Sequence, residues 1–197
     1  ARRGEGPQVV ALATRLLEQR VTRAEPLSIA RVFQSLSSPD DVLLVSVWES
    51  RDAYWAALAL DHAQEQLDAL SERGPERYFF RQLALDETPD RPVAVIDCAI
   101  LHAPPTNVDA LIADLQQRLR PMVQVAVGFV LRYLGQDEDD PTRLLLFRGW
   151  DSLDALEDFR IDQALGFEAE WAKHGATVER FVGHSRAIVE SPSHHAP

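Results

Sequence analysis

A segment near residue 50 recurs about one hundred residues later in the chain. The stretch WESRDAY, residues 48–54, reappears as WDSLDAL, residues 150–156, so that Trp48 and Trp150 are 102 positions apart. Two further anchors keep nearly the same spacing: residues 76–78 match 179–181, and residues 9–16 match 108–115. A repeat of fixed period restricts the fold more than any local pattern does. We therefore interpret the chain as one structural unit written twice.

Hydrophobic periodicity gives both copies the same order of elements. In the second copy it predicts strands at residues 92–102, 125–134, 143–150 and 178–189, and helices at residues 107–119 and 152–173. Pro121 and Gly175 are expected to follow the ends of these helices. In the first copy it predicts helices at residues 8–23 and 51–73, and strands at residues 27–36, 42–48 and 77–85. The second copy thus has the order β-α-β-β-α-β.

The first copy lacks the opening strand of this order. No strand-forming segment precedes Pro7, yet the opening strand is central in a ferredoxin-like sheet. Its loss would leave backbone groups unpaired. We expect about ten further residues upstream to supply it.

These patterns predict an α+β fold of tandem ferredoxin-like βαββαβ repeats, packed as an intramolecular α+β barrel. We expect the first repeat at residues 1–87 and the second at residues 91–190. Residues 86–91 (DETPDR) would form an exposed linker, and residues 191–197 a disordered tail.

Composition excludes several classes of function. A formal net charge of −11 argues against a nucleic-acid partner, because phosphate binding needs clustered cations. No apolar run is long enough to cross a membrane, and the single cysteine, Cys98, excludes a multi-cysteine metal site. Dinucleotide, P-loop and zinc-protease motifs are lacking in the sequence. We expect a cytoplasmic protein without cofactor or metal.

The WES-x-D-A segment, together with Leu60-Asp61-His62, resembles the antibiotic biosynthesis monooxygenase (ABM) family. The resemblance implies ferredoxin-like folds that pair into a barrel. It also implies cofactor-independent oxygenation of a small aromatic or quinol-type substrate. The haem-degrading branch has a tryptophan and a histidine on the second helix, where this chain has Ala57 and Leu67. The haem-degrading activity is therefore disfavoured.

Three aromatic or imidazole side chains of the first copy are candidates for the site. His62 falls where many family members have a histidine, and it could act as a general base. The alternative is a histidine on a helix surface. Trp48 and Trp55 are candidates for substrate binding, although the recurrence of Trp48 as Trp150 also suits packing between strand and helix.

A second group of candidates comes from the strands of the second copy. Ferredoxin-like topology would place Asp97 in mid-sheet, near Arg148 on one side and His184 on the other, with Arg132 on the remaining strand. Buried charges of this kind are costly unless they are paired. They could form a structural ion pair, or they could form the polar floor of an apolar cavity. In the second case Asp97 and His184 would be catalytic, and Arg132 and Arg148 would bind the substrate.

Two functions remain open from the sequence. One is a monooxygenase-like enzyme acting on a small aromatic molecule. The other is a non-catalytic barrel that binds a small apolar ligand or serves in assembly. A homodimer of the fused pair is the further association that we consider.

Overall fold

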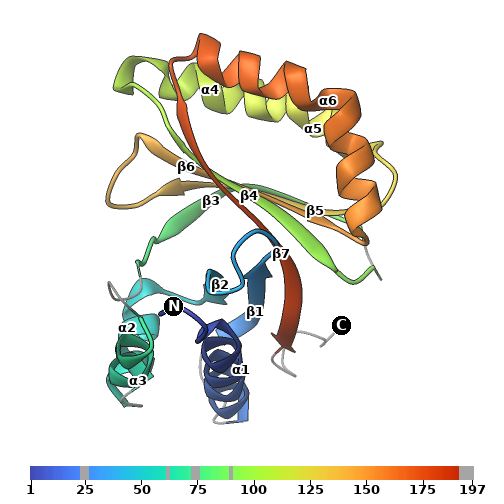
Figure 1. The fold of residues 1–197 in the computed structure, drawn as a ribbon. Coiled ribbons are helices and arrows are strands. Elements are labelled where there is room, and N and C mark those ends of the chain that lie inside the picture. Colours follow the sequence, from blue (N-terminus) through green and yellow to red (C-terminus); the bar gives the residue numbers. More distant parts are fainter. Residues whose placement is uncertain (23–26, 61–62, 72–75, 89–90, 191–197) are drawn as a thin grey trace, which may run out of the picture. The chain divides into compact units, whose positions relative to one another are not determined.

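The computed structural model describes residues 1–22, 27–60, 63–71, 76–88 and 91–190, and its chain divides into two compact units (Figure 1). The first unit comprises residues 1–77 and 183–197, and the second comprises residues 78–182. None of the described helices is long and apolar enough to span a membrane.

The first unit packs helix α1 against a three-stranded antiparallel sheet. Its elements are α1 (Gly6–Thr22), β1 (Leu27–Ser35), β2 (Val42–Trp48), α2 (Arg51–Leu60), α3 (Ala63–Ala69) and the end of β7 (Thr177–Glu190). The strand order is β2-β1-β7. Ala13 and Leu17 on α1 contact Leu27, Ala30 and Val32 on β1, and together they form the core of this unit.

The second unit places helices over one face of a five-stranded sheet (Figure 1). Its strands follow the order β7-β4-β6-β5-β3. Its elements are β3 (Phe80–Glu87), β4 (Val95–His102), the 3₁₀ turn η1 (Pro105–Asn107), α4 (Val108–Asp114), the π-helical segment η2 (Leu115–Leu119), α5 (Arg120–Gln124), β5 (Phe129–Asp137), β6 (Arg143–Trp150), α6 (Leu153–Lys173) and the start of β7. The α+β, ferredoxin-like fold class is confirmed by this arrangement.

Two of the predicted helix boundaries hold for the expected physical reasons. Ser152 caps α6, because its side chain accepts a hydrogen bond from the backbone N–H of Ala155. Gly175 adopts a φ of 66° just beyond α6. The backbone N–H of Ala176 then bonds to the carbonyl of Trp171, as in a Schellman motif.

Pro121 does not follow the end of a helix, and that expectation is wrong. The helical path continues through η2 and α5 to Gln124. Proline has no N–H to donate, and its ring crowds the carbonyl four residues earlier. The wider π turn directly before it relieves this conflict. The following strand consequently begins at Phe129 rather than at residue 125, and Val125 and Val127 lie exposed in the turn.

The prediction that residues 86–91 form a linker is wrong for the first two of these residues. Asp86 and Glu87 belong to β3, which pairs antiparallel with β5, and the Asp86 side chain is buried. Contacts group β3 with the second unit and the end of β7 with the first, so the closing strands of the two sequence copies are exchanged. The division into repeats at residues 1–87 and 91–190 stays a prediction about sequence copies. The tail at residues 191–197 lies outside the described residues.

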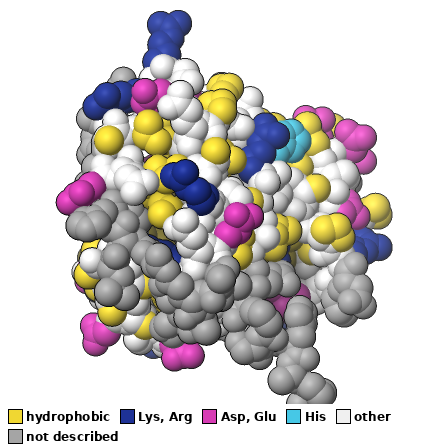
Figure 2. Space-filling model, turned by 90° about the horizontal axis from the view of Figure 1, so that it is seen from below, with side chains coloured by type: hydrophobic (Ala, Val, Ile, Leu, Met, Phe, Trp, Pro, Cys, Tyr) yellow, Lys and Arg dark blue, Asp and Glu magenta, His cyan; other side chains and the backbone are white. Residues whose placement is uncertain are grey.

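One face of the molecule shows an ordinary mixed surface (Figure 2). Basic and acidic side chains alternate there with apolar ones, and no area of one charge stands out among the described residues of this face.

Candidate functional site

Four charged side chains form one row across the sheet of the second unit. The strand register places Asp97 opposite Arg148, Arg148 opposite Arg132, and Arg132 opposite Asp86. We call these four residues the charged row. Its charges follow the order minus, plus, plus, minus along the strands β4, β6, β5 and β3.

The charged row lies on the sheet face that the helices cover. Side chains two positions apart on a strand share a face. Val95, Ala99, Leu146 and Trp150 flank the row in this way, and all belong to the core formed with α4 and α6. The four side chains are almost completely buried. The charged row thus faces the helical layer of its own unit, and its role as the polar floor of a cavity stays a prediction.

The Asp86 carboxylate, at one end of the row, accepts hydrogen bonds at both of its oxygens. The Asp86 carboxylate accepts from Nε of Arg132 at 2.9 Å, Nε of Arg120 at 2.8 Å and Nε2 of Gln124 at 2.9 Å. Arg132 also donates from Nη1 to the carbonyl of Leu115 at 3.0 Å, at the start of the π-helical segment. These bonds connect Arg132 to both the sheet and the helices, and its predicted substrate-binding role stays a prediction.

The Asp97 end of the row is not saturated. Asp97 accepts a hydrogen bond from Nη2 of Arg148 through Oδ2. Its other oxygen, Oδ1, is buried and has no hydrogen-bond partner among the described residues. A buried acceptor without a partner costs roughly 1–3 kcal/mol, so native structures rarely leave one without reason. An open acceptor therefore lies beside a buried guanidinium.

An open donor lies on the same face, close to this acceptor. Trp150 is fully buried, and its Nε1 has no hydrogen-bond partner within the described part of the chain. Val95, two residues before Asp97, stands opposite Trp150. Diagonal neighbours of this kind are typically about 7–8 Å apart in an antiparallel pair. The open acceptor and the open donor therefore lie within one diagonal step of each other on the same sheet face.

Aromatic rings line this end of the row. The Phe159 ring on α6 lies 4.8 Å from the Trp150 ring, and the Arg148 guanidinium lies 5.7 Å from the Phe159 centroid. Phe129 meets Trp150 edge-on at 6.1 Å. Such a wall suits a flat aromatic molecule.

Burial shapes the ionisation of two groups here. It lowers the pKa of Arg148, and the adjacent Asp97 carboxylate opposes that shift by favouring the charged guanidinium. Burial, with the Asp97 charge beside it, raises the pKa of the Cys98 thiol to about 12. Because Cys98 alternates with Asp97 along β4, it points to the opposite sheet face. A protonated thiol on that face is unsuited to nucleophilic chemistry.

The structure separates the predicted site residues. Asp97, Arg148 and Arg132 come together in the charged row. His184 lies in the first unit, where it stands opposite Gln34 on β1. His62 lies outside the described residues, so its predicted role stays a prediction.

The two predicted tryptophans also lie in the first unit. Trp48 is half-buried, meets Tyr54 edge-on at 5.6 Å and donates from Nε1 to the Ser46 hydroxyl at 2.9 Å. Trp55 is 44% exposed on α2 and contacts Tyr54 at 5.2 Å. Their substrate-binding role stays a prediction.

Sequence reasoning missed three residues of this site. Asp86 lies in a stretch whose composition is typical of a linker. Its spacing of two residues from Ala84, which places both on one face of a strand, is the pattern that could have indicated β3. Trp150 was assigned to packing because its motif recurs. Phe159 had no local signal, since only the fold brings α6 over Arg148.

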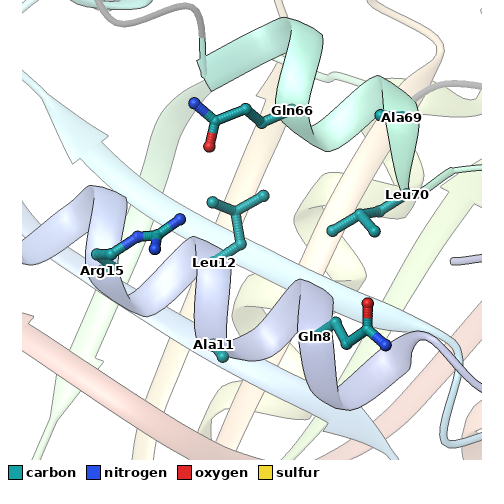
Figure 3. Close-up of a pocket in the computed structure, with 7 residues that line it drawn as sticks. All are labelled: Gln8, Ala11, Leu12, Arg15, Gln66, Ala69 and Leu70. Atoms are coloured by element: carbon teal, nitrogen blue, oxygen red, sulfur yellow. The ribbon is translucent and has the colours of Figure 1, made fainter.

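A groove in the first unit is a second candidate (Figure 3). It has a volume of about 490 Å³ and lies between α1 and α3. Leu12, Leu70 and two alanines form its apolar part, and Arg15 and Gln8 lie at opposite ends. None of the predicted site residues lines it. Within the described residues, no cluster of three or more histidine, cysteine or acidic side chains suits a metal ion.

Comparison with known proteins supports the predicted resemblance. Residues 98–164 match the family model for antibiotic biosynthesis monooxygenase. This segment begins one residue after Asp97 and holds the rest of β4, all of β6 and the first part of α6, and with them Arg148, Trp150 and Phe159. No curated protein matches the chain.

Solved structures of similar fold extend over nearly the whole chain. A candidate monooxygenase of Lactobacillus acidophilus NCFM is 8% identical, with a TM-score of 0.66 over 96% of this chain and 91% of that one. An anthrone oxidase-like protein is 12% identical, with a TM-score of 0.69 over 94% and 89%. A haem-degrading enzyme of Listeria monocytogenes is 12% identical, with a TM-score of 0.54 over 86% and 92%. At these identities the likeness shows the fold alone, which is of the ferredoxin-like α+β class.

Proposed function

We propose that the second unit is a cofactor-independent monooxygenase that acts on a small phenolic or quinol-type aromatic molecule. The observation that carries this proposal is the open acceptor Asp97 Oδ1, buried beside Arg148 on an aromatic-lined sheet face. The matching family model over residues 98–164 and the similarity to monooxygenase-like folds support it.

The groups at the Asp97 end suit the two polar ends of such a substrate. Oδ1 of Asp97 accepts the hydroxyl or C–H proton of the substrate, and Nε1 of Trp150 donates to its carbonyl oxygen. Phe159 packs on the ring. Arg148 holds Asp97 in place through their hydrogen bond and stabilises the negative charge that develops when the substrate loses a proton.

The reaction needs no external reductant, because the substrate supplies the electrons. For an anthrone-type CH₂ group, loss of a proton gives a carbanion that transfers an electron to O₂. The resulting radicals combine to form a C–O bond, and the peroxide takes up a proton. Elimination of water then breaks the O–O bond. The balance is R₂CH₂ + O₂ → R₂C=O + H₂O, with one oxygen atom in each product.

The test is oxygen uptake with a panel of anthrones and quinols, with ¹⁸O₂ incorporation read by mass spectrometry. We expect Asp97→Asn to lower the rate at least 100-fold, and Trp150→Phe to raise KM more than it lowers kcat. Asp137→Asn is the matched control, because Asp137 is another buried carboxylate of this unit that binds an arginine, Arg143, at 2.9 Å. Equal rates in wild type, Asp97→Asn and Asp137→Asn would contradict the proposal.

The same assay tests the predicted site residues that are not part of the charged row. With the site in the second unit, His62→Ala, His184→Ala and Trp55→Ala are expected to retain activity within about threefold. A large loss in His62→Ala or His184→Ala would move the site to the first unit.

A second candidate function is the binding of a small apolar ligand without catalysis. The groove between α1 and α3 favours it, since its volume falls within the range of ligand sites. A fluorescent apolar dye should bind the protein saturably, and Ala69→Trp should fill the groove and abolish binding. Dye binding that is unchanged in Ala69→Trp would exclude this groove.

A further inference from the structure

The groove between α1 and α3 is lined by one stripe of side chains from each helix (Figure 3). Residues three, four and seven positions apart share one face of a helix. The stripe of α1 has this spacing and consists of Gln8, Ala11, Leu12 and Arg15. The stripe of α3 and the residue after it has the same spacing and consists of Gln66, Ala69 and Leu70. All of these residues belong to the first unit.

The middle of the groove is apolar. Leu12 is buried, and the partly buried Leu70 packs against the cluster to which it belongs. Ala11 on α1 and Ala69 on α3 are exposed, and their short side chains leave the space between the two helices open. An alkyl chain that lies along this space would be removed from water by contact with both helices.

A cation and an amide lie at one end of the groove. Arg15 is exposed on α1, and the Gln66 side chain of α3 extends over the same end (Figure 3). Among the described residues, none forms a hydrogen bond or an ion pair with Arg15, and none of those that line the groove is acidic. The guanidinium fork can therefore bind a carboxylate through two parallel N–H donors. The Gln66 amide can donate a further hydrogen bond to it.

The opposite end of the groove limits the length of a ligand. Gln8 lies there, two helical turns before Arg15, at a distance of about 10 Å along the helix axis. This distance suits an extended acyl chain of medium length whose carboxylate meets Arg15.

We propose that this groove binds a single-chain carboxylate amphiphile, a medium-chain fatty acid, with its carboxylate at Arg15 and Gln66 and its chain along Leu12 and Leu70. The charge of Arg15 favours an anion over a neutral or cationic amphiphile of the same length. This inference rests on the second candidate function, the binding of a small apolar ligand in this groove, and adds the charge and the length of that ligand.

The probe is decanoate, added to the full chain below its critical micelle concentration and measured by equilibrium dialysis. We expect saturable binding at one site, about fivefold tighter than that of decanol, as for a bidentate ion pair that stays partly exposed. Decylammonium should bind more weakly than either. Rising salt concentration should weaken the binding of decanoate and leave that of decanol unchanged, because salt screens only the charged pair.

Arg15→Gln should weaken decanoate binding about fivefold and leave decanol binding unchanged. Arg15→Glu should reverse the preference, so that decylammonium binds more tightly than decanoate. Arg3→Gln is the matched control, because Arg3 is another exposed arginine of the first unit and does not line the groove. Circular dichroism checks that each variant is folded.

The outcomes separate this inference from the function on which it rests. If decanol binds as tightly as decanoate and Arg15→Gln affects neither, the inference is overturned and the groove remains a site for neutral apolar ligands. If decanoate binding survives Ala69→Trp, or if no probe binds, both the inference and the second candidate function fail. Arg15-dependent sedimentation with phosphatidylglycerol vesicles, but not with phosphatidylcholine vesicles, would assign Arg15 to a membrane surface and would also overturn the proposal.

Discussion

Asp97 and Asp86 are chemically the same residue at opposite ends of one row, and their surroundings differ. Asp86 accepts hydrogen bonds from Arg120, Gln124 and Arg132, so its two oxygens are satisfied and its role is structural. Asp97 bonds to Arg148 through one oxygen and leaves the other open. Burial of a charge is tolerated when it is paired, and a buried acceptor without a partner calls for an explanation. The proposed function supplies one, a bound substrate.

The buried thiol of Cys98 makes stability depend on alkaline pH. Its pKa is about 12 in the folded chain, against an ordinary value of 9.0. The folded state thus keeps its proton while the unfolded state loses it. This contribution is fully present below pH 9 and is lost as the pH rises from 9 towards 12, at about 1.4 kcal/mol per pH unit.

We expect the free energy of unfolding of wild type to fall faster than that of Cys98→Ala between pH 9 and 10.5. Urea unfolding of both proteins at several pH values measures the difference. Parallel pH profiles would show that the thiol ionises equally in both states. Alkylation of Cys98 by iodoacetamide at pH 8 should likewise require unfolding.

Among the elements, the joint between β5 and α6 depends on Gly128. Its φ is 75°, in the region that favours glycine, and a Cβ there would lie 2.3 Å from the Cβ of Ala155. The carbonyl of Gly128 also accepts from the N–H of Asp151 at 2.9 Å, just before α6. The turn after α5 can therefore pack against the start of α6 only if residue 128 has no side chain.

Gly128→Ala should destabilise the protein by about 2–5 kcal/mol, from backbone strain and overpacking together. Gly4→Ala is the control: its φ is 83°, but nothing lies within 4 Å of the new Cβ. We expect it to cost only the backbone term, about 1–2 kcal/mol. Equal losses in thermal or urea unfolding would show that crowding at Ala155 contributes nothing.

For the whole molecule, each unit contains a strand that comes from the other sequence copy. The end of β7 gives the first unit its third strand, with Ala187 opposite Val32. Without it, β1 and β2 would form a two-stranded sheet, which is marginally stable in water.

Ala187→Pro should therefore remove amide protection from α1, β1 and β2, because proline cannot donate to the ladder and breaks the pairing. Strands β4, β5 and β6 belong to the second unit and should keep their protection within about threefold. Hydrogen-exchange mass spectrometry distinguishes the two regions. Loss of protection in both would show that the chain unfolds as one cooperative unit.

The sequence by itself determined the features that local chemistry controls. The apolar periods gave most of the elements and the ferredoxin-like class, Gly175 marked the end of α6, and the motif at Trp48 and Trp150 indicated the family likeness. Asp97, Arg148 and Arg132 could be grouped because strand topology follows from the repeat.

Only the tertiary structure decided which partners each group has. The π turn before Pro121, the place of Asp86 in β3, and the ring of Phe159 over Arg148 all depend on contacts between residues distant in sequence. Hydrogen-bond saturation is a property of such contacts. The row of four charges could be predicted only in part from the sequence. Its hydrogen bonds make the Asp97 end a candidate site and the Asp86 end a structural connection between sheet and helices.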